Sequence, residues 1–179
     1  WVRCSPETIG KHGTWGGFSG AAYYFGRTLH KELNIPIGLI DSSWGGSRIE
    51  PWTPPSGFLA VPELASVVER IALATPGAPV HVEQLSDFLD RLDAWAAETR
   101  SGMAEAKTVI ASPVFPIGLK PLEQRGDPCA MYNAMIHPLV PYGIRGAIWY
   151  QGESNHHDRM LYLAKTTALV EGWRTLWGK

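Results

Sequence analysis

The chain has 179 residues, which is enough for one ordinary domain with a hydrophobic core. Hydrophobic residues make up 45% and charged residues 18%, a globular composition that excludes a disordered or fibrous protein. The formal net charge of −1 gives no electrostatic reason to expect nucleic acid or a membrane surface as a partner, and no apolar run is long enough to span a bilayer.

The first predicted elements are a helix and a strand. Apolar residues at steps of three and four predict an amphipathic helix over residues 18–34, with Ser19 near its start. The apolar run "IPIGLID" (35–41) then predicts a fully buried strand. It opens into "SSWGGSRIEPWTPP" (42–55), which is rich in Ser, Gly and Pro and is typical of a loop.

The middle of the chain is predicted to be helical. Two periodic stretches, 62–74 and 82–111, carry charges on one side and are separated by "TPGAP". We interpret them as surface helices that form an insertion or cap, at about residues 58–112. Residues 129–143 predict a short helix and a turn.

The last part of the chain repeats the order of strand, loop and helix. The run "IRGAIWY" (144–150) predicts a second buried strand, which continues into the loop "QGESNHHD" (151–158). A helix is predicted from about Arg159 to Trp177. Its predicted apolar face consists of Met160, Leu163, Val170 and Trp177.

This alternation predicts an α/β fold in which helices cover a parallel sheet. Ligands of such sheets bind beyond the carboxyl ends of the strands. The polar loops 42–48 and 151–155 both follow predicted strands directly, so we expect them at the same edge of the sheet.

The first loop contains two backbone donors that suit acyl transfer. Gly45 and Gly46 have no Cβ, so a substrate can approach their N–H groups closely. Such donors stabilise the oxyanion of a tetrahedral intermediate. A glycine pair can also simply form a tight turn, and for the pair alone that interpretation is favoured. The loop lacks the Lys of a phosphate-binding loop and the three spaced glycines of a dinucleotide-binding loop.

The second loop offers neutral amide donors. Gln151 and Asn155 suit an oxyanion or a sugar hydroxyl, and Gly152 allows the turn between them. We interpret Glu153 as a structural carboxylate that accepts hydrogen bonds from backbone N–H groups or from Arg48, in preference to a general base.

No metal site is predicted. The two cysteines, Cys4 and Cys129, have no metal-ligand spacing and provide no disulfide framework. His156 and His157 are adjacent, so their side chains point in different directions and form a poor chelate. The chain also lacks a G-x-S-x-G elbow and therefore shows no convincing pair of nucleophile and base.

Four stretches together resemble the sialate O-acetylesterase family of the SGNH (GDSL-like) hydrolases. They are "FSGAAYYFGRTLHKEL" (18–33), "PIGLIDSSWGGSRIEPW" (36–52), "MYNAMIHPLVPYGIRGAIWYQGESN" (131–155) and "WRTLW" (173–177). The resemblance implies a three-layer, flavodoxin-like α/β/α sandwich. It also implies a serine esterase without metal or other cofactor that removes O-acetyl groups from sialic acids or related carbohydrates.

The resemblance also implies roles for individual residues. Gly46, together with Gly45, supplies oxyanion-hole N–H groups, and Gln151 and Asn155 are the side-chain donors. The wider superfamily has G-x-N-D where this family has Q-G-E-S-N, which leaves open which residue of Q-G-E-S-N acts as the donor. The predicted substrate-binding residues are Ser43, Trp44, Gly152 and Glu153.

The family has four sequence blocks, and this chain matches the S-S-W-G-G and Q-G-E-S-N blocks only. Residue 1 is Trp instead of Met, and the last helix should lead into another strand. We therefore expect a central fragment of one SGNH domain over residues 1–179. The nucleophile block is expected upstream and the Asp and His block downstream, so the chain alone should be inactive.

Two rival functions stay open. One is a non-catalytic carbohydrate-binding or scaffolding module that kept the cleft and lost the catalytic blocks. The other is an esterase that acts on acetylated xylan. The oligomeric state is not predicted, and only the resemblance implies an extracytoplasmic location, periplasmic or secreted.

Overall fold

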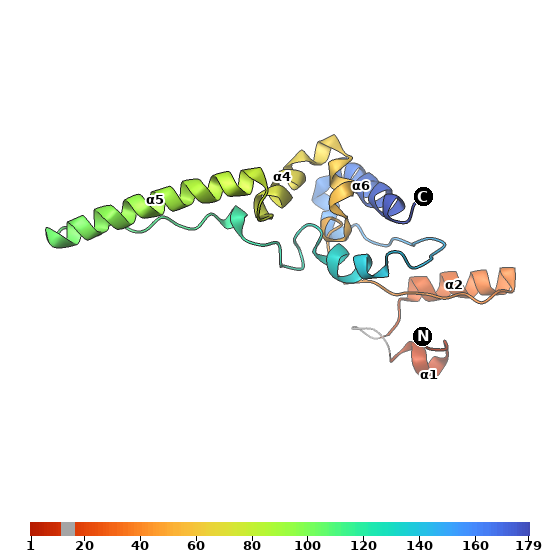
Figure 1. Ribbon diagram of the computed structural model, residues 1–179. Helices are drawn as coiled ribbons and strands as arrows, with labels where there is room; N and C mark the ends of the chain where they lie inside the picture. Colours follow the sequence, from red (N-terminus) through yellow and green to blue (C-terminus); the bar gives the residue numbers. More distant parts are fainter. Residues whose placement is uncertain (12–16) are drawn as a thin grey trace. The chain divides into compact units, whose positions relative to one another are not determined.

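The computed structural model describes residues 1–11 and 17–179, and these residues form helices and irregular segments (Figure 1). The elements in chain order are α1 (Pro6–Ile9), α2 (Gly20–Leu33), η1 (Glu50–Trp52), α3 (Pro55–Leu59), η2 (Pro62–Leu64), α4 (Ala65–Ala74), α5 (Pro79–Ala104), η3 (Ile117–Leu119), the π-helix η4 (Tyr132–Ile136), η5 (His137–Leu139), η6 (Glu153–Asp158) and α6 (Leu161–Leu176). None of the helices in the described ranges is long and apolar enough to cross a membrane.

The prediction of a parallel α/β/α sheet is wrong. Within residues 1–11 and 17–179 no strand forms, and both predicted strands, 35–41 and 144–150, are irregular segments. The apolar side chains of these segments are not buried, since Ile148 is 47% exposed and Tyr150 is 88% exposed. Apolar content favours burial of a strand, but a strand also needs a neighbouring strand to pair with, and none of the described residues forms one.

The chain divides into two compact units. Unit 1 comprises Trp1–Gly45 and Ile144–Tyr150, and unit 2 comprises Gly46–Gly143 and Gln151–Lys179. The assignment of the whole chain to part of one SGNH domain stays a prediction.

Unit 1 contains the predicted helix α2. The Ser19 hydroxyl caps its N-terminus by accepting a hydrogen bond from the Ala22 N–H at 3.3 Å. The helix ends at Asn34, whose φ of 52° is the left-handed conformation that asparagine tolerates at a C-cap. The prediction of this helix and of both its ends is confirmed.

The helical predictions for unit 2 hold in part. Helices α4 and α5 occupy the two periodic stretches, and α5 begins at Pro79, as the missing N–H of proline favours. Helix α5 ends at Ala104, before the end of the periodic stretch at residue 111. Residues 58–104 are largely helical, whereas their role as an insertion or cap stays a prediction.

Helix α6 is confirmed, but its predicted apolar face is wrong. Met160 is 78% exposed and Leu163 is 63% exposed. The buried residues of the helix are Lys165, Ala168, Leu169 and Gly172. Their spacing of i, i+3, i+4 and i+7 makes them one face of a helix.

The core of unit 2 is the crossing of α3 and α6, where two glycines allow the backbones to approach. A Cβ added at Gly57 would lie 2.1 Å from the Ala168 carbonyl oxygen. A Cβ added at Gly172 would lie 3.1 Å from the Gly57 Cα. Two small residues, Ala168 and Gly172, therefore make the contact with α3 on the buried face of α6, which the pattern of large apolar residues did not identify. The largest fully buried side chains nearby include Ile49, Phe58 and Leu64.

We expect Gly57→Ala to destabilise the protein, because the new methyl group meets backbone atoms that cannot move aside. The free energy of unfolding should fall by about 1–3 kcal/mol, as overpacking of a core usually costs. Chemical denaturation of the full-length protein measures the difference. Gly126→Ala is the matched control, since nothing lies within 4 Å of a Cβ at that position. Equal stability of the two variants would contradict this packing.

Candidate functional site

Two loops far apart in the chain meet in unit 2. The Ser154 hydroxyl donates a hydrogen bond to the Gly46 carbonyl at 3.0 Å, and Gln151 Nε2 donates to the Ser47 carbonyl at 2.9 Å. These bonds join the end of the S-S-W-G-G stretch to the Q-G-E-S-N stretch. The sequence analysis expected both loops at one sheet edge. They do meet, although neither follows a strand.

Gly46 has a conformation that glycine favours. Its φ is 71°, it is exposed, and nothing lies within 4 Å of an added Cβ. Within the described residues its N–H has no hydrogen-bond partner. The Gly46 N–H is therefore a free backbone donor at the point where the two loops meet.

Asn155 is the centre of the site and is only 1% exposed. Its Oδ1 accepts hydrogen bonds from the Ile49 N–H at 3.0 Å and from Gln151 Nε2 at 2.7 Å. Its Nδ2 donates to Asp158 at 2.6 Å and to Glu50 at 3.1 Å. The amide group thus has its oxygen and its nitrogen fully engaged inside the chain.

Gln151 is also engaged on both sides of its amide. Its Nε2 donates to Ser47 and to Asn155, as described above, while the Tyr162 hydroxyl lies 3.0 Å from its Oε1. The same hydroxyl donates to the Gln151 backbone carbonyl at 2.8 Å. Tyr162 of helix α6 therefore holds the oxygen of the Gln151 amide, while Ser47 and Asn155 hold its nitrogen.

Four charged side chains form an ion cluster beneath these amides: Arg48, Glu50, Asp158 and Lys165. Lys165 Nζ donates to Glu50 at 2.7 Å and to Asp158 at 2.8 Å. Arg48 Nη2 donates to the same two carboxylates at 2.9 and 3.0 Å. The two cations balance the two anions, and Lys165 is only 4% exposed.

The cluster keeps both carboxyl groups ionised. Burial alone would raise the pKa of Asp158, but hydrogen bonds from Asn155, Lys165 and Arg48 lower it to about 2. Burial opposes ionisation of Glu50 as well, and hydrogen bonds from Arg48, Lys165 and Asn155 still hold the pKa of Glu50 below its ordinary value. Both groups are therefore acceptors at neutral pH.

The expected role of Glu153 is not supported by its contacts. Arg48 pairs with Glu50 and Asp158 and also donates to the Ser154 carbonyl at 3.0 Å, whereas Glu153 is exposed. Glu50, Asp158 and Lys165 are absent from the predicted site residues. No local pattern marks them, because Arg159, with a φ of 51°, separates Asp158 from helix α6.

The remaining predicted site residues are divided between unit 1 and unit 2. Gly152 is half-buried and belongs to unit 2, beside Gln151. Ser43, Trp44 and Gly45 belong to unit 1. There the Ser43 hydroxyl donates to the Asp41 carboxylate at 2.6 Å, and Trp44 is 46% exposed.

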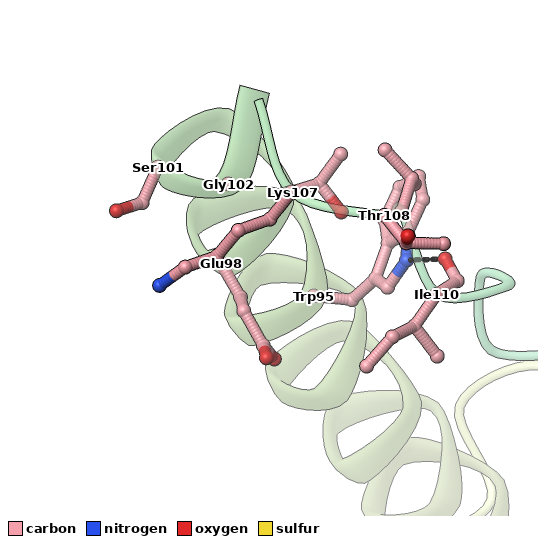
Figure 2. Close-up of a pocket in the computed structure, with 9 residues that line it drawn as sticks. Trp95, Glu98, Ser101, Gly102, Lys107, Thr108 and Ile110 are labelled. Atoms are coloured by element: carbon pink, nitrogen blue, oxygen red, sulfur yellow. Dashed lines mark hydrogen bonds between the residues drawn. The ribbon is translucent and has the colours of Figure 1, made fainter. Parts of the chain in front are cut away.

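Neither of two cavities in unit 2 is lined by a predicted site residue. One, of about 230 Å³, lies between the end of α5 and the segment that follows it, where the Trp95 indole N–H donates to the Ile110 carbonyl at 2.7 Å (Figure 2). The other, of about 270 Å³, is lined mainly by apolar residues around Cys129. Among the residues with described positions, no group of three or more His, Cys, Asp or Glu side chains is arranged to hold a metal ion.

Comparison with curated proteins identifies relatives along almost the whole chain. A sialate O-acetylesterase of Rattus norvegicus is 31% identical over 175 residues, that of Mus musculus 30% over 183, and that of Homo sapiens 29% over 177. Each alignment covers 97% of this chain. The chain belongs to the sialate O-acetylesterase family. The prediction of this family from the S-S-W-G-G and Q-G-E-S-N stretches is confirmed.

The chain spans about a quarter of the length of these sialate O-acetylesterases: 28% of the rat and mouse proteins and 24% of the human protein. No protein-family model and no solved structure matches the chain.

Because of the ion cluster, the free energy of unfolding of this sialate O-acetylesterase relative should decrease at acid pH. The pKa of Asp158 is lower in the folded chain than in the unfolded chain, so its ionised carboxylate stabilises the fold. This stabilisation is complete above about pH 4, the ordinary pKa of an aspartate, and is lost as the pH falls towards about 2. In Asp158→Asn this contribution is absent at every pH. The difference in unfolding free energy between wild type and Asp158→Asn should therefore shrink between about pH 4 and pH 2. Denaturant titrations across this range measure it, and a difference independent of pH would contradict the ionised cluster.

Proposed function

We propose that the full-length protein is a carbohydrate esterase that removes O-acetyl groups from sialic acid or a related acetylated sugar. Membership of the sialate O-acetylesterase family supports the assignment of an ester hydrolase. The observation that carries the proposal is the junction of the two loops, since Ser154 bonds to Gly46 and Gln151 bonds to Ser47.

In this proposal the Gly46 N–H donates directly to the oxyanion. It is exposed, it has no partner within the described residues, and it needs no rearrangement to meet a substrate oxygen. The Gly45 N–H is the proposed second donor. Trp44, Ser43, Gly152 and Glu153 are the proposed contacts to the acetyl group or the sugar.

Gln151 and Asn155 are proposed to support this donor. Their amide N–H groups already donate to Ser47, to Asn155 and to the two carboxylates. Direct donation to an oxyanion would require exchange of one of these bonds, so we assign both amides first to holding the loop.

The reaction follows from acyl transfer to serine. A serine hydroxyl attacks the acetyl carbonyl and passes its proton to a histidine, and the C–O bond to the sugar breaks as the histidine gives that proton to the sugar oxygen. Water, deprotonated by the same histidine, then releases acetate from the acetyl-enzyme, and the proton returns to the serine oxygen. We propose that the serine, the histidine and its aspartate belong to parts of the full-length protein that residues 1–179 do not cover. The short share of the relatives' length supports this.

A non-catalytic carbohydrate-binding or scaffolding module is the rival from another class. An acetylxylan-type esterase is the rival within the same class. Hydrolysis assays on O-acetylated sialic acid and on acetylated xylan separate all three, because the module would bind acetylated sugar without releasing acetate.

We expect Gly46→Ala in the full-length protein to reduce kcat for an activated acetate ester by about 10²-fold or more, as loss of an oxyanion-hole donor does. The φ of 71° disfavours alanine, so the N–H should turn away from the substrate. Gly77→Ala is the matched control, since Gly77 has a φ of 85° and equally open space. Equal loss of activity in both variants would contradict a role for Gly46, and no turnover by the wild type would contradict the esterase.

A further inference from the structure

Lys165 occupies a position where a lysine is unusual. It lies on the buried face of α6 with Ala168, Leu169 and Gly172, and only 4% of it is exposed. A buried lysine is almost always paired, because desolvation of the ammonium group costs several kcal/mol (order of magnitude). Here both partners are carboxylates, Glu50 and Asp158, each within 2.8 Å of Nζ.

A continuous series of hydrogen bonds leads from Lys165 to the donor loop. Glu50 and Asp158, which accept from Lys165, also accept from Asn155 Nδ2. Asn155 Oδ1 in turn accepts from Gln151 Nε2, and Gln151 donates to the Ser47 carbonyl next to Gly46. Each partner in this series fixes the orientation of the next.

The orientation of the Asn155 amide depends on the charge of the two carboxylates. An ionised carboxylate only accepts, so it requires the Nδ2 of Asn155 to point towards it and leaves Oδ1 for Gln151. Without Lys165, Arg48 alone would face two buried anions. One carboxyl group would then tend to take up a proton and become a donor, which would weaken its bond from Asn155 Nδ2 and loosen the amide that also accepts from Gln151 and from the Ile49 N–H.

We propose that Lys165 is a positioning residue that, through Glu50 and Asp158, orients Asn155 and Gln151 and so holds the turn at Gly46 in the geometry that the reaction needs. This inference rests on the proposed esterase function for its effect on catalysis. Its structural part, the orientation of the two loops, does not depend on that function.

The test compares Lys165→Met with wild type in the full-length protein. Lys120→Met is the matched control, because Lys120 is exposed and its side chain makes no described contact. We expect kcat for an activated acetate ester to fall by about 10²-fold in Lys165→Met with little change in KM, since misplacement of a site by about 1 Å costs this much. The control should keep the activity of wild type. A kcat equal to that of wild type would overturn the proposal.

Hydrogen exchange measured by mass spectrometry gives a readout that does not need activity. In Lys165→Met, exchange should increase in peptides that cover residues 46–52 and 151–158, whereas a peptide within α5 should be unaffected. If the wild type hydrolyses no ester, the proposed function fails, yet this measurement still tests the orientation of the loops. Unchanged exchange in both peptides would overturn the positioning role.

A double variant tests whether the balance of charge, and not the lysine side chain itself, orients the amides. Lys165→Met combined with Asp158→Asn leaves one cation and one anion, Arg48 and Glu50, so no buried charge lacks a partner. Both thermal stability and kcat should recover towards the values of wild type, because ionised Glu50, paired with Arg48, again requires the Asn155 Nδ2 to point towards it. Recovery of stability without recovery of kcat would overturn the proposed route from the charges to the amides.

Discussion

The structure of unit 2 depends on the balance of charge between Arg48, Glu50, Asp158 and Lys165. The cluster joins Arg48 and Glu50 to Asp158 and Lys165, which lie more than a hundred residues later in the chain, with partners at 2.7 to 3.0 Å. Removal of one partner from a buried pair commonly costs about 3–5 kcal/mol, although an apolar replacement of the whole set can be neutral. The cluster therefore specifies one arrangement of the loops more than it adds stability.

The close packing of α3 on α6 and the ion cluster use the same face of one helix. Ala168 and Gly172 permit contact with Gly57, and Lys165 lies one turn before Ala168. The tight crossing thus determines the depth at which the ammonium group lies. Any change that pushes α6 outward would also withdraw Lys165 from its two carboxylates, so packing and electrostatics are coupled here.

The helices could be predicted from the sequence because their signals are local. Ser19 and Asn34 mark the ends of α2, and Pro79 marks the start of α5. The sheet was predicted wrongly because a strand depends on a partner that a local pattern does not contain. The buried face of α6 was missed for a related reason: Met160 and Leu163 face solvent, while Lys165 and Gly172 share the buried face with Ala168 and Leu169.

Short motifs predicted the family and the two loops of the candidate site. They did not predict which residues of those loops hold the loops together and which residue has a donor left for a ligand. A motif supplies Gln151 and Asn155 as potential donors without stating which of their hydrogen bonds are already made inside the chain. Because a buried polar group must find partners, an asparagine that is 1% exposed has little left to offer a ligand. Gly46 is exposed, and its N–H makes no hydrogen bond within the described residues. Burial therefore distinguishes the amides that hold the two loops together from the Gly46 N–H, which is the proposed donor to a substrate.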